Sequence, residues 1–143
     1  MILPIGAAPI VVGFDGSPSS ERAALLALGL AERLGSEVYL VYASQGPIER
    51  AEPVTEEESG MVRTAVESAF EELRLRGAAL GIRVLPVVRE TPPGEAILTL
   101  AEELRAGIIL VGTRGLSLAG RAVLGSVSTR VVTHSKVPVT VVP

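Results

Sequence analysis

The chain has 143 residues, 48% of them hydrophobic, which suits one domain and one core over residues 1–143. Only 3% are aromatic and the net charge is −3, which argues against a nucleic-acid partner. The absence of cysteine excludes disulfides and thiolate chemistry. No apolar run is long enough to span a membrane, and the first nine residues, interrupted by prolines, make a poor signal peptide. We therefore expect a cytoplasmic protein without a membrane partner.

The first third of the chain predicts a strand, a helix and a second strand. Residues 9–14 form a short, β-branched apolar run that is typical of a buried strand. A helix should follow, because Ser17 can serve as its N-cap and Pro18 suits its first position. Gly35 lies where the C-terminal cap of this helix belongs. Glu37–Ala43 then predicts the second strand.

The middle of the chain predicts a polar excursion, a helix and an edge strand. Residues 44–58 contain prolines and clustered acids, which are typical of a solvated connection. The next helix should end at Gly77 or Gly81. Its apolar face is formed by Val62, Val66, Ala69 and Leu73. Ile82–Arg89 predicts the third strand, and its proline favours an edge position in the sheet.

The last third of the chain predicts two more helix–strand units. A helix should begin at Thr91–Pro93 and end at Gly107. Residues 108–111 are apolar at every position, which indicates a strand that is covered on both faces. After a glycine-rich loop, a helix is expected from about Ser126 to Ser135, and Val137–Val142 closes the chain as a fifth strand.

The alternation of strands and helices defines the expected fold class. It predicts a single-domain α/β fold, an open five-stranded parallel sheet of Rossmann-like type with helices on both faces. In such sheets, ligands bind beyond the carboxyl ends of the strands, where the winding direction switches. The loops after the first, second and fourth strands are therefore the expected places for a site.

The loop after the fourth strand contains a spaced glycine pattern. Gly112 and Gly115 are followed after nine residues by Gly125 and Ser126. Glycines let backbone N–H groups approach a bulky anion, and a helix start attracts phosphate. Ser126 and Ser128 add hydroxyl groups at the same helix start. The spacing fits neither a Walker A loop nor the dinucleotide fingerprint, so we predict a different kind of phosphate site.

Three features together resemble the universal stress protein family. They are Val12–Ser17 (VGFDGS), the Gly-x-x-Gly-x9-Gly-Ser pattern and Val137–Val142 (VPVTVV). The resemblance covers nearly the whole chain, and the glycine pattern marks the ATP-binding branch of the family. The resemblance implies the strand order 3-2-1-4-5, a bound ATP (or AMP or ADP) with Mg²⁺, and a homodimer formed through Val137–Val142.

The resemblance also implies which positions contact the nucleotide. At the adenosine end these are Gly13, Phe14, Asp15 and Ala43. In the ribose and phosphate loop these are Val111, Gly112, Arg114 and Gly115. At the phosphate-holding helix start these are Gly125, Ser126, Val127 and Ser128.

Several of these assignments have alternatives. Asp15 could cap the first helix together with Ser17, or it could contact the ribose or a Mg²⁺ ion on the phosphates. Ser126 could be only an N-cap. His134, the only histidine, has no metal-ligand partner at suitable spacing and is expected at a helix end or on the surface. No catalytic residue is predicted, so any ATP turnover should be slow.

Three functions are compatible with the sequence. The first is a regulatory ATP-binding protein of the stress response, which acts by a nucleotide-dependent change of shape or partner. The second is a slow ATPase or an adenylyl-transfer enzyme, although the chain has neither a His-x-Gly-His nor a Ser-Gly-Gly-x-Asp-Ser motif. The third is a nucleotide-free dimeric scaffold, in which the glycine-rich loop would be only a turn.

Overall fold

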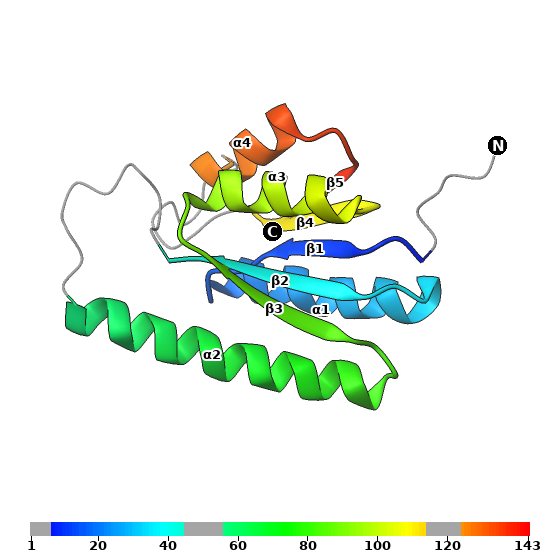
Figure 1. Cartoon of the computed structure of the whole chain (residues 1–143), viewed down its shortest axis with the longest axis horizontal. Helices are drawn as coiled ribbons and strands as arrows, with labels where there is room; N and C mark the ends of the chain where they lie inside the picture. Colours follow the sequence, from blue (N-terminus) through cyan, green and yellow to red (C-terminus); the bar gives the residue numbers. More distant parts are fainter. Residues whose placement is uncertain (1–6, 45–55, 114–123) are drawn as a thin grey trace.

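A computed structural model describes residues 7–44, 56–113 and 124–143 of the chain (Figure 1). The elements in chain order are β1 (Ile10–Gly13), α1 (Pro18–Leu34), β2 (Val38–Ala43), α2 (Glu56–Ala79), β3 (Val84–Arg89), α3 (Pro93–Leu104), β4 (Ile108–Gly112), α4 (Ser126–His134) and β5 (Val139–Val142). Most of the expected polar connection between β2 and α2 lies outside the described residues. No helix in the described ranges is both long and apolar enough to cross a membrane.

The five strands form one parallel sheet in the order β3-β2-β1-β4-β5, which confirms the fold class and the strand order. β1 lies in the centre, where Val11 is paired with Tyr39 of β2 on one side and Ile109 of β4 on the other. β3 lies at one edge, as the proline at position 86 predicts, since proline cannot donate to a ladder.

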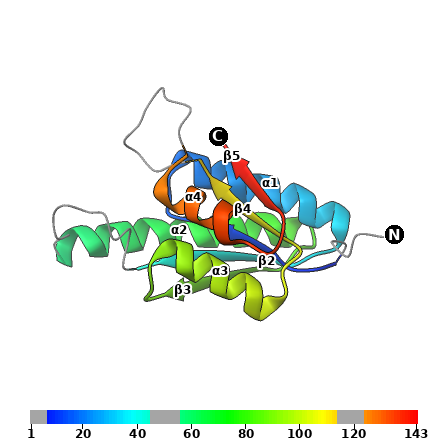
Figure 2. The same cartoon turned by 90° about the horizontal axis from the view of Figure 1, so that it is seen from above.

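Helices cover both faces of the sheet. α1 and α2 pack on one face and α3 and α4 on the other, and the view in Figure 2 has α3 and α4 in front of the strands. Because side chains alternate along a strand, Val12 and Leu110 enter the core beneath α1 and α2, whereas Val11 and Ile109 enter the core beneath α3 and α4. β4 is thus buried on both faces, as its apolar run predicts.

The caps of α1 agree with the sequence signals. The Ser17 hydroxyl accepts a hydrogen bond from the amide of Ser20 (3.3 Å), and Pro18 is the first helical residue. Gly35 ends the helix in the left-handed region, with φ of 71°. These local signals were sufficient to predict both ends of α1, because each acts within a few residues along the chain.

Predicted boundaries of α3, β3 and β5 were wrong. α3 ends at Leu104, with Arg105 (φ of 51°) as its C-cap, and not at Gly107, because Gly107 already donates to Pro9 beside β1. Of the two predicted ends of α2 the structure supports Gly81: the helix continues through Gly77 to Ala79, and Gly81 makes the turn with φ of 75° that leads to β3, which begins at Val84 and not at Ile82. β5 begins at Val139 and not at Val137, because Val137 is held in a local turn. Its N–H donates to the Ser135 hydroxyl, which in turn donates to the Val137 carbonyl.

Candidate functional site

The candidate site lies beyond the carboxyl ends of β1 and β4. The two strands are neighbours, and the chain leaves them toward opposite faces of the sheet, which makes this the switch point of the winding. Ten of the twelve predicted contact residues are described and lie on the strand ends and loops around this point. Arg114 and Gly115 lie outside the described residues.

The start of α4 presents backbone N–H groups at this edge. Gly125 is the N-cap, with extended φ of −67° and ψ of 168°, and it supplies no capping side chain. The first helical hydrogen bond runs from Thr129 N–H to the Gly125 carbonyl (2.9 Å). The amides of Ser126, Val127 and Ser128 therefore have no partner within the helix, which makes this start suited to an anion.

Ser126 is the first residue of α4 and not its N-cap, so the capping alternative for this residue was wrong. The cap position belongs to Gly125, which adopts the extended backbone that precedes a helix. The Ser126 side chain is exposed at the helix start. Its hydroxyl can thus face a ligand there without any change in the helix.

The Ser128 hydroxyl is used within the protein. Ser128 is 1% exposed, and its Oγ lies 3.1 Å from the Thr113 carbonyl oxygen and 3.0 Å from that of Gly125. A hydroxyl has one proton to donate, which these two carbonyls share. Ser128 therefore holds the start of α4 against the end of β4, and its backbone N–H is the group that it offers at the helix start.

Thr113 is the junction of this site, and the sequence pattern did not single it out. Its carbonyl accepts from the Gly125 amide (2.8 Å) as well as from Ser128, and its own amide donates to Val142 of β5 (2.8 Å). The two ends of the loop from 113 to 125 are thus joined directly. Only backbone atoms of Thr113 make these hydrogen bonds, so the residue type at position 113 could not have predicted them.

Gly112 has a packing role that the sequence interpretation missed. A Cβ atom at this position would lie 2.9 Å from the backbone carbonyl carbon of Ser19 and would overlap the Ser19 hydroxyl. Real Cβ atoms essentially never approach so closely, so the start of α1 can lie against the end of β4 only because residue 112 is glycine. This close packing brings the start of α1 to the candidate site.

Gly13 and Phe14 are placed by packing as well. A Cβ atom on Gly13 would lie 2.5 Å from Ile97 Cδ1 of α3. Phe14 is 3% exposed, and its ring lies 5.4 Å from the ring of Phe70 on α2, in the core on the α1 and α2 face. A ligand at the strand ends can therefore meet the backbone of these two residues, while the Phe14 ring points away from the site.

Ala43 and Val111 form the apolar part of the site. Both are buried, at 9% and 3% exposure, and both belong to the core beneath α3 and α4. Ala43 is the last residue of β2 and Val111 the last but one of β4, and these strands lie on either side of β1. Their short aliphatic side chains give the strand ends an apolar surface that suits a base or a ribose better than a charge.

Asp15 is exposed in the loop between β1 and α1. Its Oδ1 accepts a hydrogen bond from the Ser17 amide (2.8 Å), while Ser17 itself caps the helix. Asp15 thus shapes the turn before the cap. Among the described residues no cluster of three metal-ligating side chains exists, so a Mg²⁺ ion at Asp15 would depend on phosphate oxygens and water for its other ligands.

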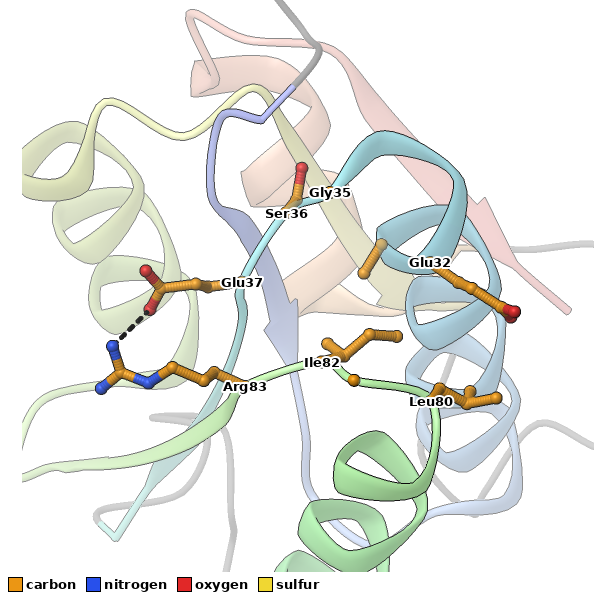
Figure 3. A pocket seen from close by; sticks show the side chains of 9 residues that line it. Glu32, Gly35, Ser36, Glu37, Leu80, Ile82 and Arg83 are labelled. Atoms are coloured by element: carbon orange, nitrogen blue, oxygen red, sulfur yellow. Dashed lines mark ion pairs between the residues drawn. The ribbon is translucent and has the colours of Figure 1, made fainter.

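A cavity of about 240 Å³ lies elsewhere, beyond the amino ends of β2 and β3 (Figure 3). It is lined by the end of α1 and by residues 80–83, which connect α2 to β3. An ion pair between Arg83 and Glu37 (3.6 Å) lies at its border. This edge of the sheet is opposite to the switch point, and none of the predicted contact residues lines the cavity. The cavity is therefore separate from the candidate site.

The fold defines a Rossmann-like α/β protein, with a candidate ligand site at the switch point of its parallel sheet. The comparison with known families agrees, because the model of the universal stress protein family matches residues 7–143. The chain belongs to this family.

Two related proteins match over nearly their whole lengths. A universal stress protein of Thermus aquaticus is 35% identical over 138 residues, covering 93% of this chain and 96% of the relative. Universal stress protein Rv1636 of Mycobacterium tuberculosis is 34% identical, with 93% and 94% covered. A crystal structure of a universal stress protein in complex with cAMP superposes with a TM-score of 0.68 at 32% identity, covering 95% of this chain and 97% of that one.

Proposed function

We propose that this chain is a regulatory universal stress protein that binds ATP at the carboxyl ends of β1 and β4. The observation that carries the proposal is the start of α4, where a glycine N-cap leaves the amides of Ser126, Val127 and Ser128 without partners in the helix. The family relative crystallised with cAMP supports an adenine nucleotide as the ligand. Binding would change the shape or the partners of the protein, and no chemical step is required.

Each part of the candidate site then has a role. The triphosphate would lie at the start of α4, where the helix dipole and the free amides stabilise negative charge. The ribose and adenine would lie toward Ala43 and Val111, on the apolar ends of β2 and β4. Asp15 would hold Mg²⁺ on the phosphates through its carboxylate. Arg114 and Gly115, outside the described residues, would complete the phosphate loop.

Fast hydrolysis of ATP is not part of this proposal. A base that activates water must lie within hydrogen-bond reach of it. His134, the only histidine of the chain, is the last residue of α4, and its Nδ1 lies 3.0 Å from the Arg130 carbonyl. This places the imidazole at the far end of the helix from the proposed phosphates. His134 therefore cannot act as this base, and we expect turnover to be slow.

ATP with Mg²⁺ is expected to stabilise the protein against heat. A ligand at about one hundred times its Kd adds about 2.7 kcal/mol to the free energy of unfolding. For a domain of this size this corresponds to a rise in Tm of about 8 °C. Differential scanning calorimetry measures the shift, and GTP at the same concentration tests the preference for adenine. An unchanged Tm at millimolar ATP, with no heat in a titration, would refute nucleotide binding.

We also propose a homodimer through β5. β5 is an edge strand, and Val139–Val142 is only partly buried. The carbonyl oxygens of Pro138 and Val142 accept hydrogen bonds from amides of residues 109 and 113, on the side of β4. Because the N–H and C=O groups of successive residues point to alternate sides of a strand, those of Val139 and Val141 face outward. An uncovered apolar edge invites pairing with a second copy.

The variant Val141→Pro tests this dimer. It removes an outward-facing N–H and leaves the ladder with β4 intact, since the backbone of Val141 does not face β4. Light scattering should be measured at tens of micromolar protein, about the concentration at which a dimer with a micromolar Kd is mostly formed. It should give a dimer for the parent chain and a monomer for the variant. A parent chain that is monomeric would contradict the proposal, as would a dimer that the proline leaves unchanged.

A further inference from the structure

The outer face of α2 carries exposed apolar side chains. Val66 and Leu73 point from α2 into the core, and α2 lies on the outside of the molecule, with its start extending beyond the strands (Figure 1). Met61 and Leu75 are 69% and 55% exposed. Met61, Ser68 and Leu75 are spaced seven residues apart, so they drift by only about 20° per step around the helix and form one stripe opposite the buried face.

A shallow hollow of about 580 Å³ lies at one end of this stripe. It is lined by Glu57, Gly60, Met61, Thr64 and Ala65. The first four have the spacing i, i+3, i+4 and i+7, which is how neighbouring residues on one helix face surround a hole for a side chain of a facing helix. Gly60 and Ala65 are small, which keeps this hole open.

We propose that α2 pairs antiparallel with α2 of a second copy of this chain. Ser68 lies midway between Met61 and Leu75, so a two-fold axis at Ser68 places Leu75 of each copy over the Met61 hollow of the other. The contact is the same on both copies, as a two-fold interface requires. The small Ser68 side chain at the axis lets the two helices approach closely.

The charges along α2 favour the antiparallel arrangement. The helix begins with Glu56 and Glu57, whereas near its end Arg74 and Arg76 pair with Glu71 (2.7 Å) and Glu72 (3.1 Å) of the same helix. In the proposed register Arg76 of one copy lies opposite Gly60 of the other, within one turn of Glu57, so its guanidinium can bridge Glu72 of its own helix and Glu57 of the other. A parallel pair would instead bring the two acidic helix starts together. This interface is separate from β5, so the two together would build assemblies larger than a dimer.

A single introduced cysteine tests the pairing, because the chain has no cysteine of its own. Two cysteines at a two-fold axis can form a disulfide when their Cα atoms lie about 4.4–6.8 Å apart. The variant Ser68→Cys should therefore give a covalent dimer under mild oxidation, visible by non-reducing electrophoresis. The matched control is Glu67→Cys, whose side chain is 63% exposed on the flank of the helix. We expect Ser68→Cys to cross-link at least about ten times faster than this control, since it alone lies on the axis.

Three further variants test the contacts themselves. Adding Leu75→Glu to Ser68→Cys should lower its cross-linking rate to that of the control, because the side chain that fills the hollow becomes charged. Adding Glu57→Arg should slow cross-linking, and the double exchange Glu57→Arg with Arg76→Glu should restore it. Equal rates for Ser68→Cys and Glu67→Cys in folded proteins would overturn the proposal. A fast rate that neither Leu75→Glu nor the charge exchange alters would overturn it too.

Discussion

Ser126→Asp is expected to abolish ATP binding and leave the protein folded. Ser126 is the first residue of α4 and is exposed, so its replacement disturbs no packed contact. A carboxylate in the first turn of a helix is favourable for the helix dipole. The same carboxylate would lie against the proposed triphosphate. Two like charges about 4 Å apart repel by about 4 kcal/mol at an effective dielectric of 20, which corresponds to a loss of about a thousandfold in affinity.

Isothermal titration calorimetry with ATP and Mg²⁺ measures this loss. The matched control is Thr133→Asp, which places the same charge on an exposed position near the other end of α4. Its affinity should remain close to that of the parent chain. If Ser126→Asp binds ATP as tightly as the parent, with unchanged circular dichroism, then the phosphates do not lie at the start of α4.

Gly112→Ala is expected to lower the stability of the protein with or without a nucleotide. The added Cβ atom would lie 2.9 Å from the Ser19 carbonyl carbon, so the start of α1 must move away from β4. Overpacking of this kind costs about 1–3 kcal/mol. Thermal denaturation should show a Tm that is lower by about 3–10 °C. Nucleotide affinity should fall as well, because the displaced helix start borders the candidate site.

Gly29→Ala is the control for this prediction. Gly29 lies within α1, and a Cβ atom there would meet no heavy atom within 4 Å. Alanine is the better helix former by about 0.5–1 kcal/mol, so this variant should be more stable than the parent. The change from glycine to alanine is thus expected to lower the stability at position 112 and to raise it at position 29. A Gly112→Ala protein as stable as the parent would show that the close packing at Ser19 does not constrain the fold.

The fold was largely predictable because its signals are local. Ser17, Pro18 and Gly35 mark the ends of α1 within a few residues of each other, and the apolar run of β4 indicates a central strand. The end of α3 was not predictable in this way. Arg105 adopts the left-handed conformation that glycine usually takes, because Ala106 is buried and Gly107 is bound to Pro9. These are contacts with distant parts of the chain, which a local pattern does not contain.

The candidate site was predictable in position and less so in the role of each residue. The glycine spacing predicts a phosphate site at residues 125–128, and in the structure these residues form the start of α4 with a glycine cap. The roles of Ser128 and Gly112 depend on Thr113 and Ser19, which lie far from them in sequence and close in space. The buried Phe14 ring similarly depends on Phe70 of α2. Tertiary neighbours therefore decide which atoms of a motif face a ligand.

The most direct test of nucleotide binding at the start of α4 is a titration with ATP and Mg²⁺ followed by the backbone amide resonances in NMR. We expect the amides of Gly125, Ser126, Val127 and Ser128 to shift most, because their N–H groups would contact the phosphates. The contradicting result is that these resonances stay in place while the amides of Gly35 and Gly81 shift. Those two glycines line the cavity at the opposite edge of the sheet, and the nucleotide would then bind there.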